Sequence, residues 1–226
     1  MQPSSRNHIL DNALASSRME GYQADEQTRR DCLRLMNGKV DAAPLPQKFW
    51  QGAGNKGIEG MASYSVNALT DDCYQGTTVL INKLNINNQG DLDAVESAIV
   101  PAKAALWEEN PLMVSFDFAH YCAIHKYLFE DLYEWAGKIR TVDISKKGTP
   151  FCPAVQIEST AQAVFSRLQA QNYLRGLNKT AFTNELVDPY ERTNELHPSG
   201  RKRSHAACVF VTINTLRRIR IGFYLH

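Results

Sequence analysis

The sequence predicts an all-α protein in which one β-hairpin interrupts a helical bundle. Apolar residues recur at the three- and four-residue spacing of helices over most of the 226 residues. The spacing changes to strict alternation only between about 138 and 157, around a turn that contains Gly. Clusters of Pro and Gly separate two short N-terminal helices from the longer helical part.

Composition and charge place the chain among ordinary soluble proteins. Hydrophobic residues make up 43% of it and charged residues 22%. A net charge of +1 argues against nucleic acid or a membrane surface as a partner. Five widely spaced cysteines do not suggest a disulfide framework, and no stretch approaches the roughly 20 apolar residues of a membrane span. Because the N-terminus also lacks an apolar signal segment, we expect a cytoplasmic protein.

Residues 1–42 form the first predicted part. Within it, residues 7–37 read as two helices, the first of which ends at Gly21. The second begins near Asp25 and stops at Gly38. Neither helix is long enough to be stable alone in water, so both must pack against the rest of the chain.

A linker rich in Pro and Gly, residues 43–70, precedes the main domain, 71–198. The domain should open with a helix capped by Asp91. A long amphipathic helix should then run from Phe116 to Trp135 and end at Gly137.

The predicted hairpin follows. Ile139, Val142 and Ile144 alternate with polar residues and lead into a turn at 146–149. Helical spacing resumes at 161–168, as Ala161, Val164, Phe165 and Leu168. A last helix should run from Ala181 to His197, with a kink at Pro189 inside it.

The stretch around His197 has the residues of half an active site. Residues 194–198 read NELHP, and a histidine at a helix end can act as a general base near neutral pH. The following SGRKRS, 199–204, is basic and opens onto another helix, whose N–H groups suit an anion. It contains no acidic residue to hold a metal, so we assign no metal ligand.

Several segments together resemble the Fic (filamentation induced by cAMP) proteins of bacteria. Residues 74–86 resemble the opening of the Fic domain, and 124–140 its central helix and exit. The hairpin falls where the family has its substrate-aligning flap, and 194–198 resembles the lead-in to its HPFx[D/E]GNGRxxR motif. The resemblance covers roughly 72–198 and implies the Fic fold, a helical bundle with a β-hairpin flap.

The N-terminal part is similar to the small antitoxins encoded beside Fic toxins. Ser16 and Glu20 occupy the fixed positions of an [S/T]xxxE[G/N] inhibitory helix. In the family this Glu pairs with the last Arg of the catalytic motif and impairs ATP binding, so the resemblance implies an inhibitory helix within the chain. The alternative is a short amphipathic helix whose Glu is solvated.

After Pro198 the chain departs from the family motif. Codons permitted for residues 199–208, regrouped one nucleotide later, read REGNGRTQRV, which matches the missing motif. We therefore interpret 199–226 as a divergent, frame-shifted tail. We expect it to be poorly packed, because Arg217, Arg218 and Arg220 would fall on a helix that the family buries.

The resemblance implies AMPylation, the transfer of AMP from ATP to a protein Ser, Thr or Tyr hydroxyl with Mg²⁺ as cofactor. His197 would be the catalytic base. The flap would bind the backbone of the target protein as an added strand, through Lys146, Lys147, Gly148 and Thr149. Gly200 and Arg201 remain as candidate nucleotide contacts. Because the metal ligand is missing, a self-inhibited, impaired enzyme and a non-catalytic binding module both stay open.

Two other readings of the sequence are weaker. His120, Cys122 and His125 could suggest zinc, but their spacing does not place three ligands on one helix face. The basic triplet 201–203 could suggest nucleic acid, but isolated triplets are usually only solvated.

Overall fold

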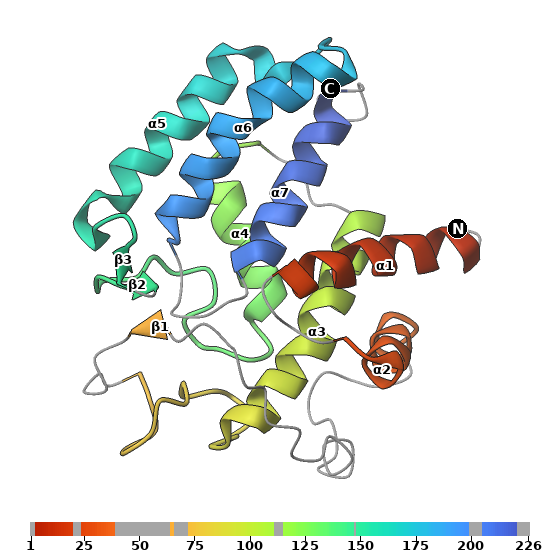
Figure 1. Ribbon diagram of the computed structural model, residues 1–226, viewed down its shortest axis with the longest axis vertical. Coiled ribbons are helices and arrows are strands. Elements are labelled where there is room, and N and C mark those ends of the chain that lie inside the picture. The colour runs from red at the N-terminus through yellow and green to blue at the C-terminus, as the bar shows by residue number, and fades with distance from the viewer. Residues whose placement is uncertain are drawn as a thin grey trace.

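The computed structural model describes residues 3–19, 24–38, 64–65, 72–110, 115–146, 148–198 and 205–220. These residues form a helical molecule (Figure 1). Its helices are α1 (Pro3–Met19), α2 (Glu26–Met36), α3 (Gln89–Glu109), α4 (Phe118–Phe129), α5 (Ile157–Ala170), α6 (Lys179–Leu196) and α7 (His205–Arg220). Two 3₁₀ turns, η2 (Ala154–Gln156) and η3 (Asn172–Leu174), flank α5, and the strands are β1 (Tyr64–Ser65), β2 (Ser145–Lys146) and β3 (Thr149–Pro150). The all-α prediction is confirmed.

The two predicted N-terminal helices are present as α1 and α2. Asp25 begins α2, and its carboxylate accepts a hydrogen bond from the Thr28 N–H at 2.7 Å. Gly38 follows the helix with a φ of +64°, a conformation that suits Gly after a helix end. The predicted end of α1 at Gly21 lies outside the described residues.

The third helix begins one turn earlier than predicted. Asn88, not Asp91, is its N-cap, and the Asn88 side chain accepts from the Asp91 N–H at 3.1 Å. Asp91 therefore lies in the first turn, where a carboxylate still favours the helix dipole.

The helix predicted over 116–135 is shorter in the structure. Helix α4 ends at Phe129, and residues 130–137 form turns. Leu132 and Tyr133 are nevertheless buried in the core, so the apolar spacing continues past the end of the helix. Gly137 closes the turns with a φ of +80°, and a Cβ there would lie 2.7 Å from that of Lys126. The Gly137 N–H donates to His125 Nδ1 at 2.9 Å, which ties the turns back to α4.

The predicted hairpin is present but shorter. β2 and β3 pair antiparallel with Ser145 opposite Pro150, and β1 pairs with the other edge of β2, giving the order β1-β2-β3. Ile139, Val142 and Ile144 do not belong to a strand, although Ile144 is buried. β1 lies within the predicted linker, 43–70, whose other residues lie outside the described part.

Two apolar clusters form the core. The smaller joins α1 and α2 to α3 and consists of Leu10, Leu14, Cys32, Met36, Ala102 and Ala105. The larger gathers buried residues of α3 to α7, and Ala13 of α1 belongs to it. Figure 1 shows β2 and β3 at the lower end of α5 and α6, with α1 and α2 on the opposite side of the molecule. The N-terminal helices therefore share a hydrophobic core with the main domain.

The prediction that the tail after Pro198 is poorly packed is wrong for residues 205–220. Helix α7 contacts α1, α3, α4 and α6, and Cys208, Val211 and Ile219 are fully buried. Their spacing places one apolar stripe along the helix, with Arg217 on the opposite face and Arg218 at the edge of the stripe. Arg217 is exposed, and Arg218 forms an ion pair of 3.0 Å with Glu108. Arg217 thus avoids the costly burial that we expected, and the charge of the part-buried Arg218 is paired. The side chain of Arg220 lies outside the described part of the chain.

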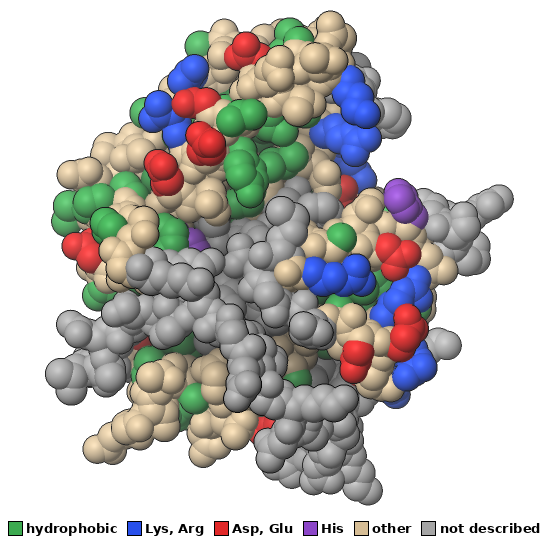
Figure 2. Space-filling view, in the orientation of Figure 1, with side chains coloured by type: hydrophobic (Ala, Val, Ile, Leu, Met, Phe, Trp, Pro, Cys, Tyr) green, Lys and Arg blue, Asp and Glu red, His purple; other side chains and the backbone are tan. Residues whose placement is uncertain are grey.

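Charged side chains of both signs alternate over α1 and α2 (Figure 2). One such pair joins Arg29 of α2 to Asp11 of α1 at 3.0 Å. Within the described part of the chain, no helix combines the length and apolar character that crossing a membrane requires.

Candidate active site

His197 lies directly after α6, at the point where the chain leaves the helix. Its backbone is left-handed, with φ +39° and ψ 57°. This conformation costs a residue with a side chain about 1–2 kcal/mol, so the surroundings must hold it in place. His197 is only 2% exposed, and its imidazole stacks on the Phe151 ring, with 4.4 Å between ring centroids and 22° between planes. The fold thus brings His197 against the residue that follows the hairpin.

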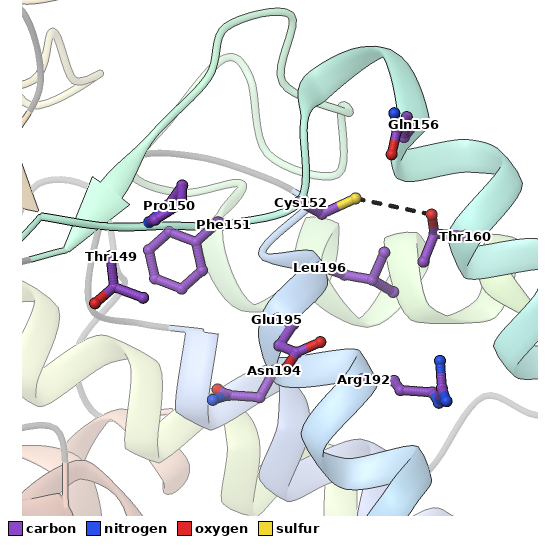
Figure 3. A pocket seen from close by; sticks show the side chains of 10 residues that line it. All are labelled: Thr149, Pro150, Phe151, Cys152, Gln156, Thr160, Arg192, Asn194, Glu195 and Leu196. Carbon is purple, nitrogen blue, oxygen red and sulfur yellow. Dashed lines mark hydrogen bonds between the residues drawn. The ribbon is translucent and has the colours of Figure 1, made fainter.

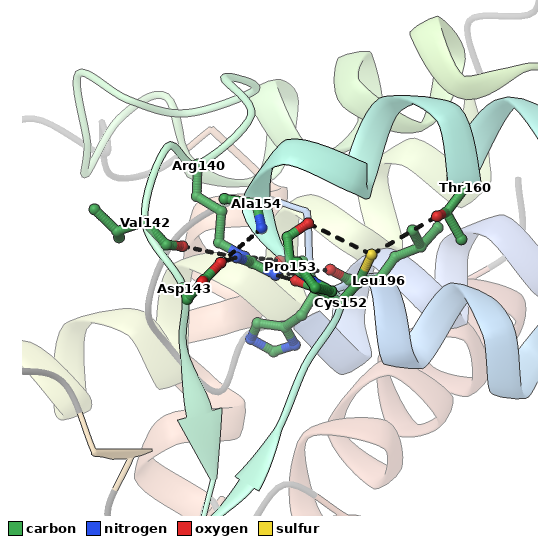
Figure 4. A network of polar contacts seen from close by, with 9 residues as sticks. Arg140, Val142, Asp143, Cys152, Pro153, Ala154, Thr160 and Leu196 are labelled. Atoms are coloured by element: carbon green, nitrogen blue, oxygen red, sulfur yellow. Dashed lines mark hydrogen bonds and ion pairs between the residues drawn. The ribbon is translucent and has the colours of Figure 1, made fainter.

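The end of α6 is tied to the hairpin through the main chain. A helix leaves its last four carbonyls without partners inside the helix. Here the carbonyls at the end of α6 (residues 195–197), and that of Pro198 just beyond it, accept hydrogen bonds from two residues that flank the hairpin. Figure 4 draws Arg140 and Cys152 with Leu196 at the end of the helix. Cys152 N–H donates to Glu195 O at 3.1 Å, and Arg140 donates to the other three.

The Arg140 side chain is buried, with 3% of it exposed. Burial lowers the pKa of Arg140 from its ordinary value, but a guanidinium starts so high that it stays charged near neutral pH. The Asp143 carboxylate lies 4.0 Å away and is itself 79% exposed. Asp143 instead accepts from the Ala154 N–H at 2.7 Å, which joins the two sides of the hairpin (Figure 4).

A pocket of about 650 Å³ opens beside this junction (Figure 3). Residues 149–152, from β3 and the chain just after it, form one wall, and the α6 residues that face them are Arg192, Asn194, Glu195 and Leu196. Gln156 and Thr160 close the pocket from the η2–α5 side. Phe151 belongs to the pocket wall and also touches His197, so the pocket is adjacent to the imidazole. A space of this kind suits a side chain or a short extended segment of a partner.

Three of the four residues predicted to form the flap lie in the hairpin, as the alternating pattern predicted. Gly148 forms the turn with a φ of +81°, and Thr149 is exposed in β3. Lys146 lies in β2, and Lys147 lies outside the described residues. His197 lies next to this hairpin through its contact with Phe151, the residue directly after β3.

The remaining predicted site residues are described only in part. Ser16 lies in α1 and is partly buried. Glu20, Gly200 and Arg201 lie outside the described residues. Helix α1 does contact α7, the helix that follows the candidate site in the sequence.

Sequence reasoning missed the three residues that build the junction, Arg140, Phe151 and Cys152. A signal was present for Arg140, because it is a cation at the start of an alternating apolar segment. Nothing in the pattern showed that Phe151 would stack on a histidine 46 residues later.

The side chains present can be tested for their ability to bind Zn²⁺ or Mg²⁺. Among the described residues, no group of three or more His, Cys, Asp or Glu side chains is placed to hold a metal ion. Of the suggested zinc ligands, His125 accepts from the Gly137 N–H, and burial lowers the pKa of His120. Residues 199–204 contain no carboxylate, so the chain after Pro198 does not offer the oxygen ligands that Mg²⁺ prefers.

Comparison with known proteins finds a similarity for both parts of the chain. The N-terminal residues 6–48 match the family model of the antitoxin VbhA. The chain is 36% identical over 125 residues to the probable protein adenylyltransferase Fic of Escherichia coli K12, covering 55% of this chain and 62% of that relative. It is 36% identical over 151 residues to the probable protein adenylyltransferase y4lH of Sinorhizobium fredii, covering 66% of this chain and 77% of that relative.

A solved structure agrees with this match. The BepC protein of Bartonella tribocorum, a VirB-translocated effector with bound AMPPNP, is similar with a TM-score of 0.58 and 26% identity. The similarity covers 62% of this chain and 74% of BepC. The predicted Fic fold is thereby confirmed. Since sequence and fold agree, and most of the rhizobial relative is matched, the chain belongs to the Fic family of protein adenylyltransferases.

Proposed function

We propose that this chain is a protein adenylyltransferase, which transfers AMP from ATP to a hydroxyl of a protein Ser, Thr or Tyr. The observation that carries the proposal is the position of His197, held at the end of α6 against the flap in a chain of this family. The match spans 62% of the E. coli relative, so the activity is proposed from the site as well as from the relatives.

The chain's own residues would act on the acceptor protein. His197 would take the proton from the attacking hydroxyl. Because Phe151 stacks on one face of the imidazole, the hydroxyl would approach the edge of the ring, where the nitrogens lie. The flap would bind an extended acceptor segment by strand addition, and the neighbouring pocket would receive one of its side chains.

The nucleotide would bind on the other side of His197. ATP, when bound, would supply the α-phosphorus that the hydroxyl oxygen attacks, with pyrophosphate as the leaving group, and BepC carries bound AMPPNP. The N-terminal N–H groups of α7, together with Gly200 and Arg201, would contact the phosphates. The residues present do not fit Mg²⁺, so we assign it no ligand and no role in this chain.

The residues after Pro198 depart from the family motif, and this departure supports a low rate of AMP transfer. Losing one preorganised donor to a transition state can cost about 100- to 1,000-fold in rate. Here the acidic residue, two glycines of the anion site and the last Arg of the family motif are replaced together. The same observation favours a second candidate, a non-catalytic Fic-shaped protein that binds partners through its N-terminal helices or its flap.

The N-terminal helices would inhibit the enzyme from within the chain. The VbhA match covers them, and Leu10 and Leu14 pack against Ala102 and Ala105 of α3. We propose that Glu20, with Ser16 four residues before it in the sequence, is the residue that would inhibit a chain with the intact family motif. Since the arginine that Glu20 would engage is replaced in this chain, Glu20→Gly should change AMP transfer very little.

Transfer of label from ATP carrying ³²P at the α-phosphate tests both candidates. The first protein is the 226-residue chain. In the second, the other reading frame is restored after Pro198, so that Phe-Arg-Glu-Gly-Asn-Gly-Arg-Thr-Gln-Arg follows. We expect the restored protein with Glu20→Gly to label itself or a target, and His197→Ala to abolish the labelling. The restored protein that keeps Glu20 should bind Mg·ATP weakly.

Two outcomes would contradict this account. No transfer by the restored Glu20→Gly protein would remove the proposed activity and leave the binding module. Transfer by the unrepaired chain would show that residues 199–204 can replace the family motif.

A further inference from the structure

One guanidinium joins the three pieces of chain that meet at the candidate site (Figure 4). Arg140 follows the turns after α4, and its donors reach both sides of the flap and the end of α6. Its bonds are Nε to His197 O (2.9 Å), one Nη to Val142 O (2.7 Å), the other Nη to Leu196 O (3.3 Å) and to Cys152 O, and the main-chain N–H to Pro198 O (2.9 Å).

These acceptors are main-chain carbonyls, so the guanidinium is used for its shape as well as its charge. Helix α6 has no basic residue in its last turn, and its dipole makes the carbonyls there partly negative. A cation placed among them replaces the missing cap. Hydrogen bonds from a charged donor are roughly twice as strong as neutral ones.

The contacts of Arg140 also explain how His197 keeps its left-handed backbone. The carbonyls of Leu196, His197 and Pro198 are all held by Arg140, which fixes the peptide planes before and after the histidine. The same side chain holds Cys152 O, next to the Phe151 ring that covers the imidazole. Both partners of the ring stack are thereby fixed to one rigid group.

We infer that Arg140 is the positioning residue of this site, which sets the imidazole of His197 against the flap by binding the main chain of both. The inference deepens the proposed function, because it gives the general base its orientation. Arg140 itself would not touch the substrate, because it acts through the positions of His197 and Phe151.

Lysine should not replace Arg140. The guanidinium presents five donors in a fixed planar fork, whereas an ammonium is a point charge with three rotating donors. Lys at position 140 keeps the charge near the end of α6 but cannot reach the His197, Val142 and Cys152 carbonyls together. Charge and shape can therefore be separated with Arg140→Lys and Arg140→Met.

The ring stack provides the readout. In the protein labelled with ¹³C at histidine Cε1, we expect the ring current of Phe151 to displace the His197 resonance, because the two rings stack 4.4 Å apart. His197→Gln identifies that resonance among the six histidines by its loss, and Phe151→Leu shows its position without the ring. We expect Arg140→Met to move the resonance at least half of the way to the Phe151→Leu position, and Arg140→Lys to move it part of the way.

A matched control separates positioning from general stability. Arg167 pairs with Asp188 at 2.9 Å on the surface between α5 and α6, so Arg167→Met removes an arginine away from the stack. The His197 resonance should stay in place in that variant. If it moves there as well, or if folded Arg140→Met keeps the wild-type position, the inference is wrong.

The test also gives an answer if the Arg140→Met variant does not fold. If Arg140→Met does not fold, by circular dichroism, Arg140→Lys decides, and an unmoved resonance in it overturns the inference. None of these measurements uses ATP. If the His197 resonance moves in the Arg140 variants but the restored Glu20→Gly protein transfers no label, only the proposed function is contradicted. If that protein transfers label but the resonance stays in place in the Arg140 variants, only the positioning role is contradicted.

Discussion

At the scale of single residues, Asn82 shows how one buried amide organises a loop. Its Nδ2 donates to Leu80 O at 3.0 Å and to Ile86 O at 2.7 Å. Its Oδ1 accepts from the N–H groups of Leu84 and Ile86. The amide therefore uses two donors and two acceptor positions, which is the capacity of an asparagine side chain. It takes the place of the regular secondary structure that residues 81–86 lack.

We expect Asn82→Ala to lower the free energy of unfolding by about 3 kcal/mol, because it leaves buried main-chain groups without partners. Urea denaturation followed by circular dichroism measures this. Asn87, an exposed neighbour, supplies the control, and Asn87→Ala should stay within about 0.5 kcal/mol. Equal effects of the two substitutions would show that the Asn82 contacts do not organise the loop.

The cysteines should differ in reactivity. Burial raises the pKa of the Cys32 thiol to about 12 and that of Cys208 well above its ordinary value. Both thiols should stay protonated, and hence unreactive, in the folded protein at pH 8. Iodoacetamide labelling followed by mass spectrometry should modify the partly exposed Cys73 and Cys152 first. Early modification of Cys32 would mean that α2 does not remain packed on α3.

At the scale of elements, the sequence predicted the existence of helices better than their ends. The turns at 130–137 carry buried apolar residues at near-helical spacing, so periodicity alone extended α4. The flap was recognised from its Gly turn. Its attachment to α6 was not, because Arg140, Phe151 and Cys152 contact residues far away in sequence. The local spacing of apolar residues cannot predict contacts between residues so far apart in sequence. The resemblance of 194–198 to the Fic motif, in contrast, predicted that His197 lies near the flap.

The cap of α2 offers a test that depends on pH. The N–H of Thr28 holds the pKa of Asp25 below its usual value. The stabilisation from the ionised cap is therefore present above the unfolded-state pKa and is lost as the pH falls through the folded-state pKa. Asp25→Ala should cost about 1 kcal/mol at pH 7 and less below pH 3.

Asp25→Asn is the matched control for that prediction. Asn keeps an oxygen acceptor for the Thr28 N–H and carries no charge, so it should retain most of the capping energy at every pH. Unfolding measured between pH 2 and pH 7 distinguishes the two. A cost of Asp25→Ala that does not change with pH would rule out the ionised carboxylate as the cap.

At the scale of the whole molecule, α7 completes the core. Leu216 is 2% exposed within the larger apolar cluster, so Leu216→Ala should lower the free energy of unfolding by about 2–5 kcal/mol. Val187 of α6 is 50% exposed, and Val187→Ala should change it by less than about 0.5 kcal/mol. Hydrogen exchange in 208–219 should be as slow as in α4. Rapid exchange there would restore our first expectation of a poorly packed tail.

The shared core of α1 with α3 and α7 changes how an antitoxin-like segment responds to concentration. An inhibitor on a separate chain leaves its partner when both are diluted, because their association is bimolecular. Here the segment and the Fic domain are one polypeptide, so docking is unimolecular, and dilution leaves the docked fraction unchanged. Its effective concentration is set by the chain itself and lies on the order of millimolar for a short connection. Release would require cleavage of the chain or a ligand that competes for the contacts of α1, and degradation of a free antitoxin would have no equivalent.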